Sequence, residues 1–152
     1  MWYNVYGDKM KRKLLFVLLC IFILTGCNSD KELKCVYKDG NSNMDVITTQ
    51  KYSFDKEGKI IKKINIITEY NYKDKYINYL KNNKIDIKDS INTDSICNSY
   101  KSYTDSKCNV TYKNNKVNIE ITIKLSKKES KKINEDYKFY KKYYEGLKYE
   151  CK

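Results

Sequence analysis

The sequence predicts an α+β fold, in which an antiparallel sheet of four to six strands carries about three helices on one face. Two stretches with apolar residues at every second position, each interrupted by a short polar turn, predict the sheet. Apolar residues at spacings of three and four, between and after these stretches, predict the helices. Polar residues at the alternate strand positions indicate that the other face of the sheet contacts water.

The strands follow in order along the chain. Residues 33–38 form a modest strand that the sequence "DGNSN" ends. The first hairpin closes around Gly58, and the second turns at Asn114 and Asn115. In the first hairpin, the side chains expected to face the core are Val46, Thr48, Tyr52, Phe54, Ile60, Ile64, Ile66, Thr68, Tyr70 and Tyr72. In the second hairpin they are Val110, Tyr112, Val117, Ile119, Ile121, Ile123 and Leu125.

The predicted helices should cover this sheet. One apolar stripe contains Tyr72, Tyr76, Ile77 and Leu80, and another contains Ile96, Cys97, Tyr100 and Tyr103. After the second hairpin, Ser126 and Glu129 form a candidate capping box. A third stripe follows it, with Ile133, Tyr137, Tyr140, Tyr144 and Leu147, and Gly146 is expected to stop that helix. The final "LKYECK" is expected to return to the sheet as an edge strand.

The apolar run from Leu14 to Leu24 lies outside this domain. It is far shorter than the roughly 20 residues that a membrane-spanning helix needs. Basic residues precede it and small residues follow it, as in an export signal. The alternative is a buried helix, but the run has no amphipathic face. Residues 1–9 fit neither interpretation and are taken as an upstream extension or a misread start before Met10.

The end of this run, Leu24-Thr25-Gly26-Cys27, resembles the lipobox of bacterial lipoproteins. The resemblance implies that the chain is cut between Gly26 and Cys27, and that the Cys27 thiol carries a diacylglyceryl group. Residues 1–26 would then be a signal peptide, residues 27–32 a tether, and residues 33–152 a single domain. The expected location is the extracytoplasmic face of the cell membrane, with the membrane itself as a partner through the lipid.

Four further cysteines lie in the predicted domain: Cys35, Cys97, Cys108 and Cys151. Outside the cytosol, an even number of cysteines indicates disulfides, and four allow three pairings. We expect Cys97–Cys108, which are close in the chain, and Cys35–Cys151, which lie near the two ends of the domain. Free thiols and intermolecular pairing are the alternatives. A metal site is not expected, because the chain has no C-x-x-C pair and no histidine.

The composition favours binding over catalysis. Without histidine, the commonest general base and the usual nucleophile pairs are missing. Six carboxylates remain as candidate acids or bases, but none lies in a motif or an apolar setting that would shift its pKa for catalysis. They are Glu57, Glu69, Asp74, Asp94, Asp105 and Glu120. Glycines at phosphate-binding spacing are also missing. We expect no enzymatic activity and no cofactor.

The charge and the tyrosines point to possible partners. A formal net charge of +12 attracts polyanions such as anionic wall polymer or lipid headgroups. Nucleic acid is not expected, because phosphate recognition favours arginine and Arg12 is the only one. Of the 16 tyrosines, Tyr137, Tyr140 and Tyr144 are interpreted as core, and Tyr143 and Tyr149 as exposed binding candidates.

The order of elements, the lipobox and the two outlying cysteines resemble the small YehR-like lipoproteins of Gram-positive bacteria. That resemblance implies a fold and a location but no activity. The expected function is a non-enzymatic binding or structural role in the cell envelope. The alternatives are a polyanion- or glycan-binding envelope protein and a small inhibitor of a wall hydrolase of the lysozyme type, which would present a rigid loop near a disulfide.

Overall fold

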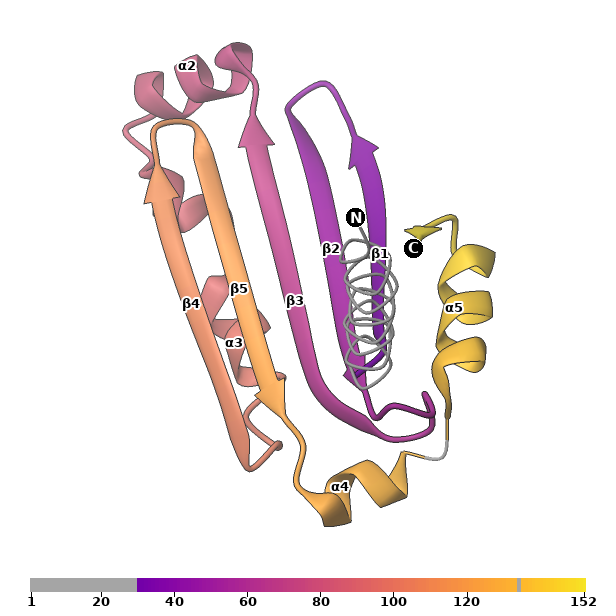
Figure 1. Ribbon diagram of the computed structural model, residues 1–152. Helices are drawn as coiled ribbons and strands as arrows, with labels where there is room; N and C mark the ends of the chain where they lie inside the picture. Colours follow the sequence, from indigo (N-terminus) through magenta and orange to yellow (C-terminus); the bar gives the residue numbers. More distant parts are fainter. Residues whose placement is uncertain (1–29, 134) are drawn as a thin grey trace, which may run out of the picture.

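The computed structural model describes residues 30–133 and 135–152, so Gly26 and Cys27, and with them the predicted signal and lipidation site, lie outside the described residues. The described chain is a single α+β domain, as the sequence predicts. One antiparallel sheet has the strand order β4-β5-β3-β2-β1-β6 (Figure 1). No helix within the described ranges is long and apolar enough to cross a membrane.

The six strands agree with the predicted hairpins. They are β1 (Glu32–Gly40), β2 (Met44–Phe54), β3 (Ile61–Tyr72), β4 (Asp105–Lys113), β5 (Lys116–Lys124) and β6 (Glu150–Cys151). The β2–β3 turn contains Gly58 at a φ of 76°, a left-handed conformation that glycine adopts without strain. β1 begins at Glu32 and the Lys31 carbonyl already accepts a hydrogen bond from Phe54, so the sheet starts within the predicted tether.

The helices are shorter than the stripes suggest. The described residues form α2 (Asp74–Asn82), the 3₁₀ helix η2 (Ile87–Ser90), α3 (Thr93–Asn98), α4 (Lys127–Lys132) and α5 (Tyr137–Gly146). Figure 1 shows α2 and α4 at opposite ends of the sheet. Tyr72, predicted in the first helical stripe, is instead the last residue of β3, where it stacks on Tyr76 of α2.

The C-terminal stripe is two helices and not one. The capping box of Ser126 and Glu129 is confirmed, with the Glu129 backbone N–H donating to Ser126 Oγ over 3.2 Å. The chain then leaves the helical conformation at Ile133, and a second helix begins after Asp136, whose carboxylate accepts from the Phe139 N–H. A polar cap inside an apolar stripe therefore overrides the periodicity.

The core lies between one face of the sheet and the helices. Paired residues on this face include Leu33, Tyr52, Ile64 and Ile123, which follow one another across β1, β2, β3 and β5. Ile60, expected on this face, is 43% exposed, and Ile61 is buried in its place. The register shifts between Ser53 and Phe54, and this irregularity reverses the parity at the start of β3.

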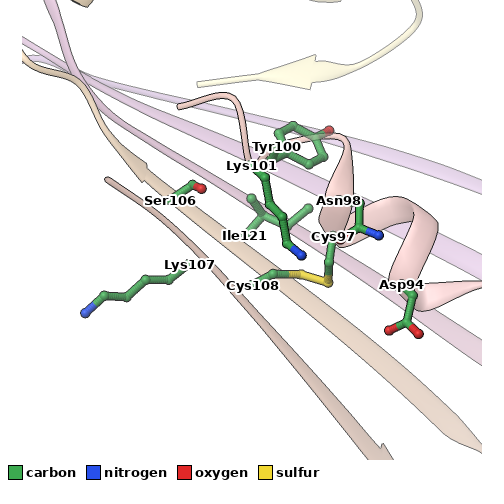
Figure 2. Close-up of a pocket in the computed structure, with 9 residues that line it drawn as sticks. All are labelled: Asp94, Cys97, Asn98, Tyr100, Lys101, Ser106, Lys107, Cys108 and Ile121. Atoms are coloured by element: carbon green, nitrogen blue, oxygen red, sulfur yellow. A yellow bond between two sulfur atoms is a disulfide. The ribbon is translucent and has the colours of Figure 1, made fainter. Parts of the chain in front are cut away.

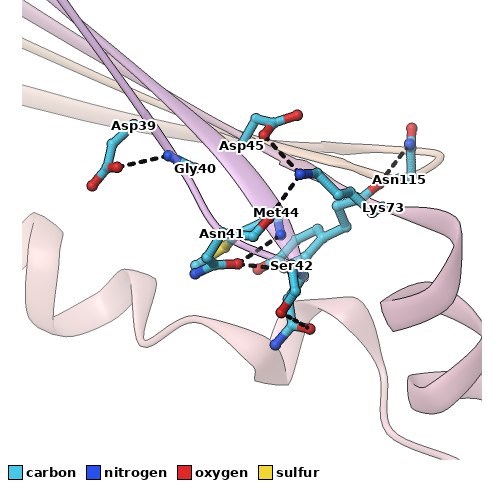
Figure 3. A network of polar contacts seen from close by, with 10 residues as sticks. Asp39, Gly40, Asn41, Ser42, Met44, Asp45, Lys73 and Asn115 are labelled. Atoms are coloured by element: carbon cyan, nitrogen blue, oxygen red, sulfur yellow. Dashed lines mark hydrogen bonds and ion pairs between the residues drawn. The ribbon is translucent and has the colours of Figure 1, made fainter.

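At the end of the sheet beside α2, where β1 turns into β2, a polar network connects the turns (Figure 3). Lys73, just before α2, donates to the Asn41 carbonyl over 2.7 Å and pairs with the Asp45 carboxylate at 3.1 Å. Asn115 of the β4–β5 turn donates to the Tyr72 carbonyl over 2.9 Å. This end of the sheet is thus tied together by three separate turns.

Candidate functional site

A cleft of about 430 Å³ lies over the middle of the sheet, between the helices. Its floor consists of Gln50, Tyr52, Ile64, Ile66 and Ile123, from β2, β3 and β5. Its walls and rim consist of Tyr100, Tyr103, Lys132, Ile133, Glu135, Tyr140 and Tyr144. We call it the tyrosine cleft. Its size falls within the range of small-molecule sites, which are mostly apolar with a few oriented polar groups.

The floor of the tyrosine cleft contains a chain of three polar groups. The Tyr52 hydroxyl donates to Gln50 Oε1 over 2.6 Å, and its oxygen lies 2.5 Å from that of Tyr144. Because Tyr52 has one proton, donation to Gln50 leaves Tyr144 as the donor to Tyr52. Burial raises the pKa of Tyr52 far above its ordinary value, and burial also raises the pKa of Tyr144. Both phenols therefore stay neutral at physiological pH.

One wall of the tyrosine cleft depends on the Cys97–Cys108 disulfide. Cys97 belongs to α3 and Cys108 to β4, and the bond holds the following segment, with Tyr100 and Tyr103, beside the sheet. Figure 2 shows the other side of this segment, where Lys101, Asn98 and the disulfide line a second cavity of about 260 Å³. Burial raises the pKa of Tyr100.

The other wall depends on the Cys35–Cys151 disulfide. Cys35 and Cys151 are paired residues of β1 and β6, and α5 lies immediately before β6 in the chain. From α5, Tyr140 and Tyr144 face the cleft, with ring centroids 4.8 Å and 5.7 Å from that of Tyr52. Burial and then the Glu135 charge raise the pKa of Tyr140 to about 12. Both cysteine pairs match the pairing that the sequence predicts.

Two tyrosine predictions have different outcomes. Tyr143 is exposed, as predicted, and stacks on Phe139 with a centroid distance of 6.1 Å. Tyr149 was expected to be exposed, but it is half-buried between Tyr37 and Tyr144, with centroid distances of 5.1 Å and 5.0 Å. Tyr149 directly follows Lys148, whose φ of 66° turns the chain back toward the sheet.

The outer side of α5 also differs from the prediction. Leu147 was assigned to the buried stripe, yet its side chain is 48% exposed. It lies one helical turn after Tyr143, which lies one turn after Phe139, so these three form an exposed row. Tyr144 is buried as predicted, while Tyr137 and Tyr140 are half-buried and pack against the core.

None of the six candidate carboxylates lines the tyrosine cleft. Glu69 and Glu120 lie on the polar face of the sheet, away from the cleft, where Glu120 accepts from Asn65 Nδ2 over 2.9 Å. Within the described ranges, no group of three histidine, cysteine, aspartate or glutamate side chains is placed to hold a metal ion. Two charged groups do reach the tyrosine cleft: Lys132, the last residue of α4, and Glu135, from the break between α4 and α5.

Comparison with known proteins adds no assignment, because no family model, curated protein or solved structure matches the chain. The resemblance to the YehR-like lipoproteins therefore stays a prediction.

Proposed function

We propose that the chain is a non-enzymatic lipoprotein, anchored through Cys27 to the outer face of the cytoplasmic membrane, that binds an envelope component in the tyrosine cleft. The observation that carries the binding function is the cleft itself. Five tyrosines from β2, α5 and the segment after α3 surround one cavity, and each of the two disulfides supports one of its walls. Disulfides also suit an extracytoplasmic location.

The chemistry of the tyrosine cleft favours a neutral ligand with a ring, such as a sugar unit of an envelope glycan. Tyrosine rings offer flat apolar surfaces for stacking, and their hydroxyls form hydrogen bonds at the edge. The buried phenols are neutral, and the charged groups Lys132 and Glu135 have opposite signs. The cleft therefore provides contact area and hydrogen bonds without a strong net charge.

Calorimetric titration of the purified protein with an N-acetylglucosamine tetramer tests the glycan proposal. Saturable binding is expected, and Tyr103→Ala should weaken it about fivefold, because an aromatic contact of this kind contributes about 1 kcal/mol. Tyr79→Ala is the matched control, since Tyr79 is 55% exposed on α2 and does not line the cleft. Absence of heat with this tetramer and with solubilised wall glycan would reject a sugar ligand.

The lipid anchor is tested separately. Intact mass of the protein extracted from membranes should show a diacylglyceryl group and cleavage before Cys27. Cys27→Ser should abolish both the added mass and the cleavage. If the Cys27→Ser protein is still cut at the same bond and stays with the membrane without lipid, the anchoring proposal is wrong.

Inhibition of a wall hydrolase is a second candidate. The segment after α3 is closed by Cys97–Cys108 and exposes Lys101 and Ser102, which is the kind of constrained loop that an inhibitor presents. Stoichiometric addition of the protein to a lysozyme would then suppress wall lysis, and Lys101→Ala with Ser102→Ala would relieve the suppression. Unchanged lysis at a molar excess of the protein would exclude this candidate for that hydrolase.

A further inference from the structure

The end of the sheet where β1 begins carries a cluster of lysines. In α4, the four residues Lys127, Lys128, Lys131 and Lys132 are all exposed. The buried Ser130 donates to the Ile61 carbonyl over 2.7 Å and fixes which side of the helix faces the sheet. At 100° per residue, Lys128, Lys131 and Lys132 lie on the half of α4 that Ser130 leaves free, whereas Lys127 lies about 60° from Ser130, at the edge of the side that faces the sheet.

The described acidic side chains at this end form no ion pair with these lysines, although Asp55 lines the same cavity as Lys127 and Lys131, and Glu135 lines the tyrosine cleft with Lys132. Glu129 is occupied by the capping box and by Thr104, with an Oε1 to Oγ1 distance of 3.0 Å. Asp136 caps α5, and Asp30 pairs with Lys62 at 2.6 Å. Among the described residues, no carboxylate lies within ion-pair distance of the four α4 lysines.

Exposed apolar surface lies beside the lysines. Ile60 is 43% exposed, and together with Leu125 it lines a cavity of about 340 Å³ whose rim includes Lys62, Lys127 and Lys131. We call the four α4 lysines with Ile60 and Leu125 the basic end. A surface that combines lysines with a few exposed apolar side chains is suited to the boundary between lipid headgroups and acyl chains.

The basic end is also the end nearest to the proposed anchor. Asp30 is three steps along the chain from Cys27, with two residues between them, and an extended chain spans at most about 3.6 Å per step, or about 11 Å in all. Asp30 is ion-paired with Lys62, which lines the same cavity as Ile60. A lipid on Cys27 would therefore hold this end of the sheet, and not the α2 end, close to the bilayer (Figure 1).

We propose that the basic end docks on the anionic phospholipid headgroups of the membrane that holds the Cys27 anchor, which fixes the orientation of the domain. The proposal rests on the lipoprotein function given above. Docking turns the α2 end away from the bilayer and gives the anchor a second, electrostatic attachment. A second attachment matters because acyl chains and basic patches reinforce each other in membrane binding.

Lysine footprinting of the lipidated protein tests this orientation. The protein is reconstituted into vesicles of phosphatidylcholine alone and of phosphatidylcholine with phosphatidylglycerol, treated with an amine-acylating reagent, and analysed by mass spectrometry. With phosphatidylglycerol, Lys128 and Lys132 should be acylated about fivefold more slowly, the effect expected for one lysine at an anionic surface. Lys75, Lys113 and Lys116 should react equally in both vesicles. High salt should remove the difference.

Matched charge variants identify the surface. Lys127→Glu with Lys131→Glu should abolish the protection of Lys128 and Lys132, whereas Lys113→Glu with Lys116→Glu, at the far end of the sheet, should retain it. All four positions are exposed, so neither pair perturbs the core.

The outcomes separate the docking proposal from the lipoprotein proposal. A protein that carries the lipid but shows equal acylation in both vesicles overturns the docking alone. If the native protein carries no lipid and floats with neither kind of vesicle, the docking proposal and the lipoprotein proposal are both wrong. Protection of the same lysines by soluble lipoteichoic acid, without protection by phosphatidylglycerol vesicles, would reassign the basic end to a wall polymer and reject the membrane as its partner.

Discussion

The hydroxyl oxygens of Tyr52 and Tyr144 lie 2.5 Å apart and join β2 to α5 at the floor of the tyrosine cleft. Tyr52→Phe removes a buried hydroxyl that also donates to Gln50. Because the partner groups keep their positions but lose their hydrogen bonds, we expect the free energy of unfolding to fall by about 1 to 3 kcal/mol. Urea denaturation measures this change, with Tyr79→Phe as the exposed control. Equal stabilities of the two variants would contradict the role of this contact.

Alkaline pH should destabilise the fold through the buried tyrosines. Burial raises the pKa of Tyr52, Tyr72, Tyr100 and Tyr144 above the unfolded value of 10.0, and that of Tyr140 to about 12. Above pH 10.0 the unfolded chain loses these protons first, so the folded state binds more protons and the free energy of unfolding falls as pH rises. Below pH 10.0 these groups add no pH dependence.

Thermal unfolding followed across this alkaline range checks the prediction. The midpoint should decline steadily between pH 10.0 and about 12. A constant midpoint over this range would be inconsistent with buried neutral phenols.

The two disulfides should contribute unequally to stability. Cys35–Cys151 spans a sequence separation of 116 residues and Cys97–Cys108 spans 11. In the entropic model, the long bond contributes about 4 to 5 kcal/mol and the short one about 3 kcal/mol. Urea midpoints of Cys35→Ala with Cys151→Ala, and of Cys97→Ala with Cys108→Ala, measure the two losses. A larger loss for the short bond would show that local packing outweighs chain entropy.

Two glycines should respond to alanine in opposite directions. Gly146 is helical in α5 and a Cβ there would meet no atom within 4 Å, so Gly146→Ala should stabilise the fold by about 0.5 to 1 kcal/mol. Gly58 has a φ of 76°, and a Cβ there would lie 3.2 Å from Tyr137 and from Lys31. Gly58→Ala should cost about 1 to 3 kcal/mol. Thermal midpoints of both variants provide the comparison, and the same sign for both would refute it.

Most of the sheet could be predicted because a two-residue period directly reports which side chains face the core. The edge strand with Cys151 and both cysteine pairs also followed from position along the chain. The burial of Ile61 in place of Ile60 could not be predicted. A register shift changes which strand positions face the core, and it leaves no mark in the amino-acid composition.

The tyrosine cleft was harder to predict than the sheet. Its floor residue Tyr52 lay on the predicted core face, but the cleft exists because the helical stripe breaks between Ile133 and Asp136. Asp136 was the available signal, as an aspartate before an apolar helical turn. The end of α5 shows the same difficulty, because Gly146 remains helical and Lys148 adopts the left-handed conformation. Glycine is the commonest residue in the left-handed conformation that follows a helix, but in this chain Lys148 adopts that conformation after α5.

The C-terminal strand β6 determines how a mechanical load would pass through the molecule. Lys152 exchanges two backbone hydrogen bonds with Lys34, at 2.8 Å and 2.9 Å, next to the covalent link between Cys35 and Cys151. Tension applied at the C-terminus therefore enters β1 directly and continues toward residue 27, while β2 to β5 and the cleft that they support remain unstrained. A bulky fusion at Lys152 would pull against a covalent bond close to the start of β1 and leave the remaining strands in register.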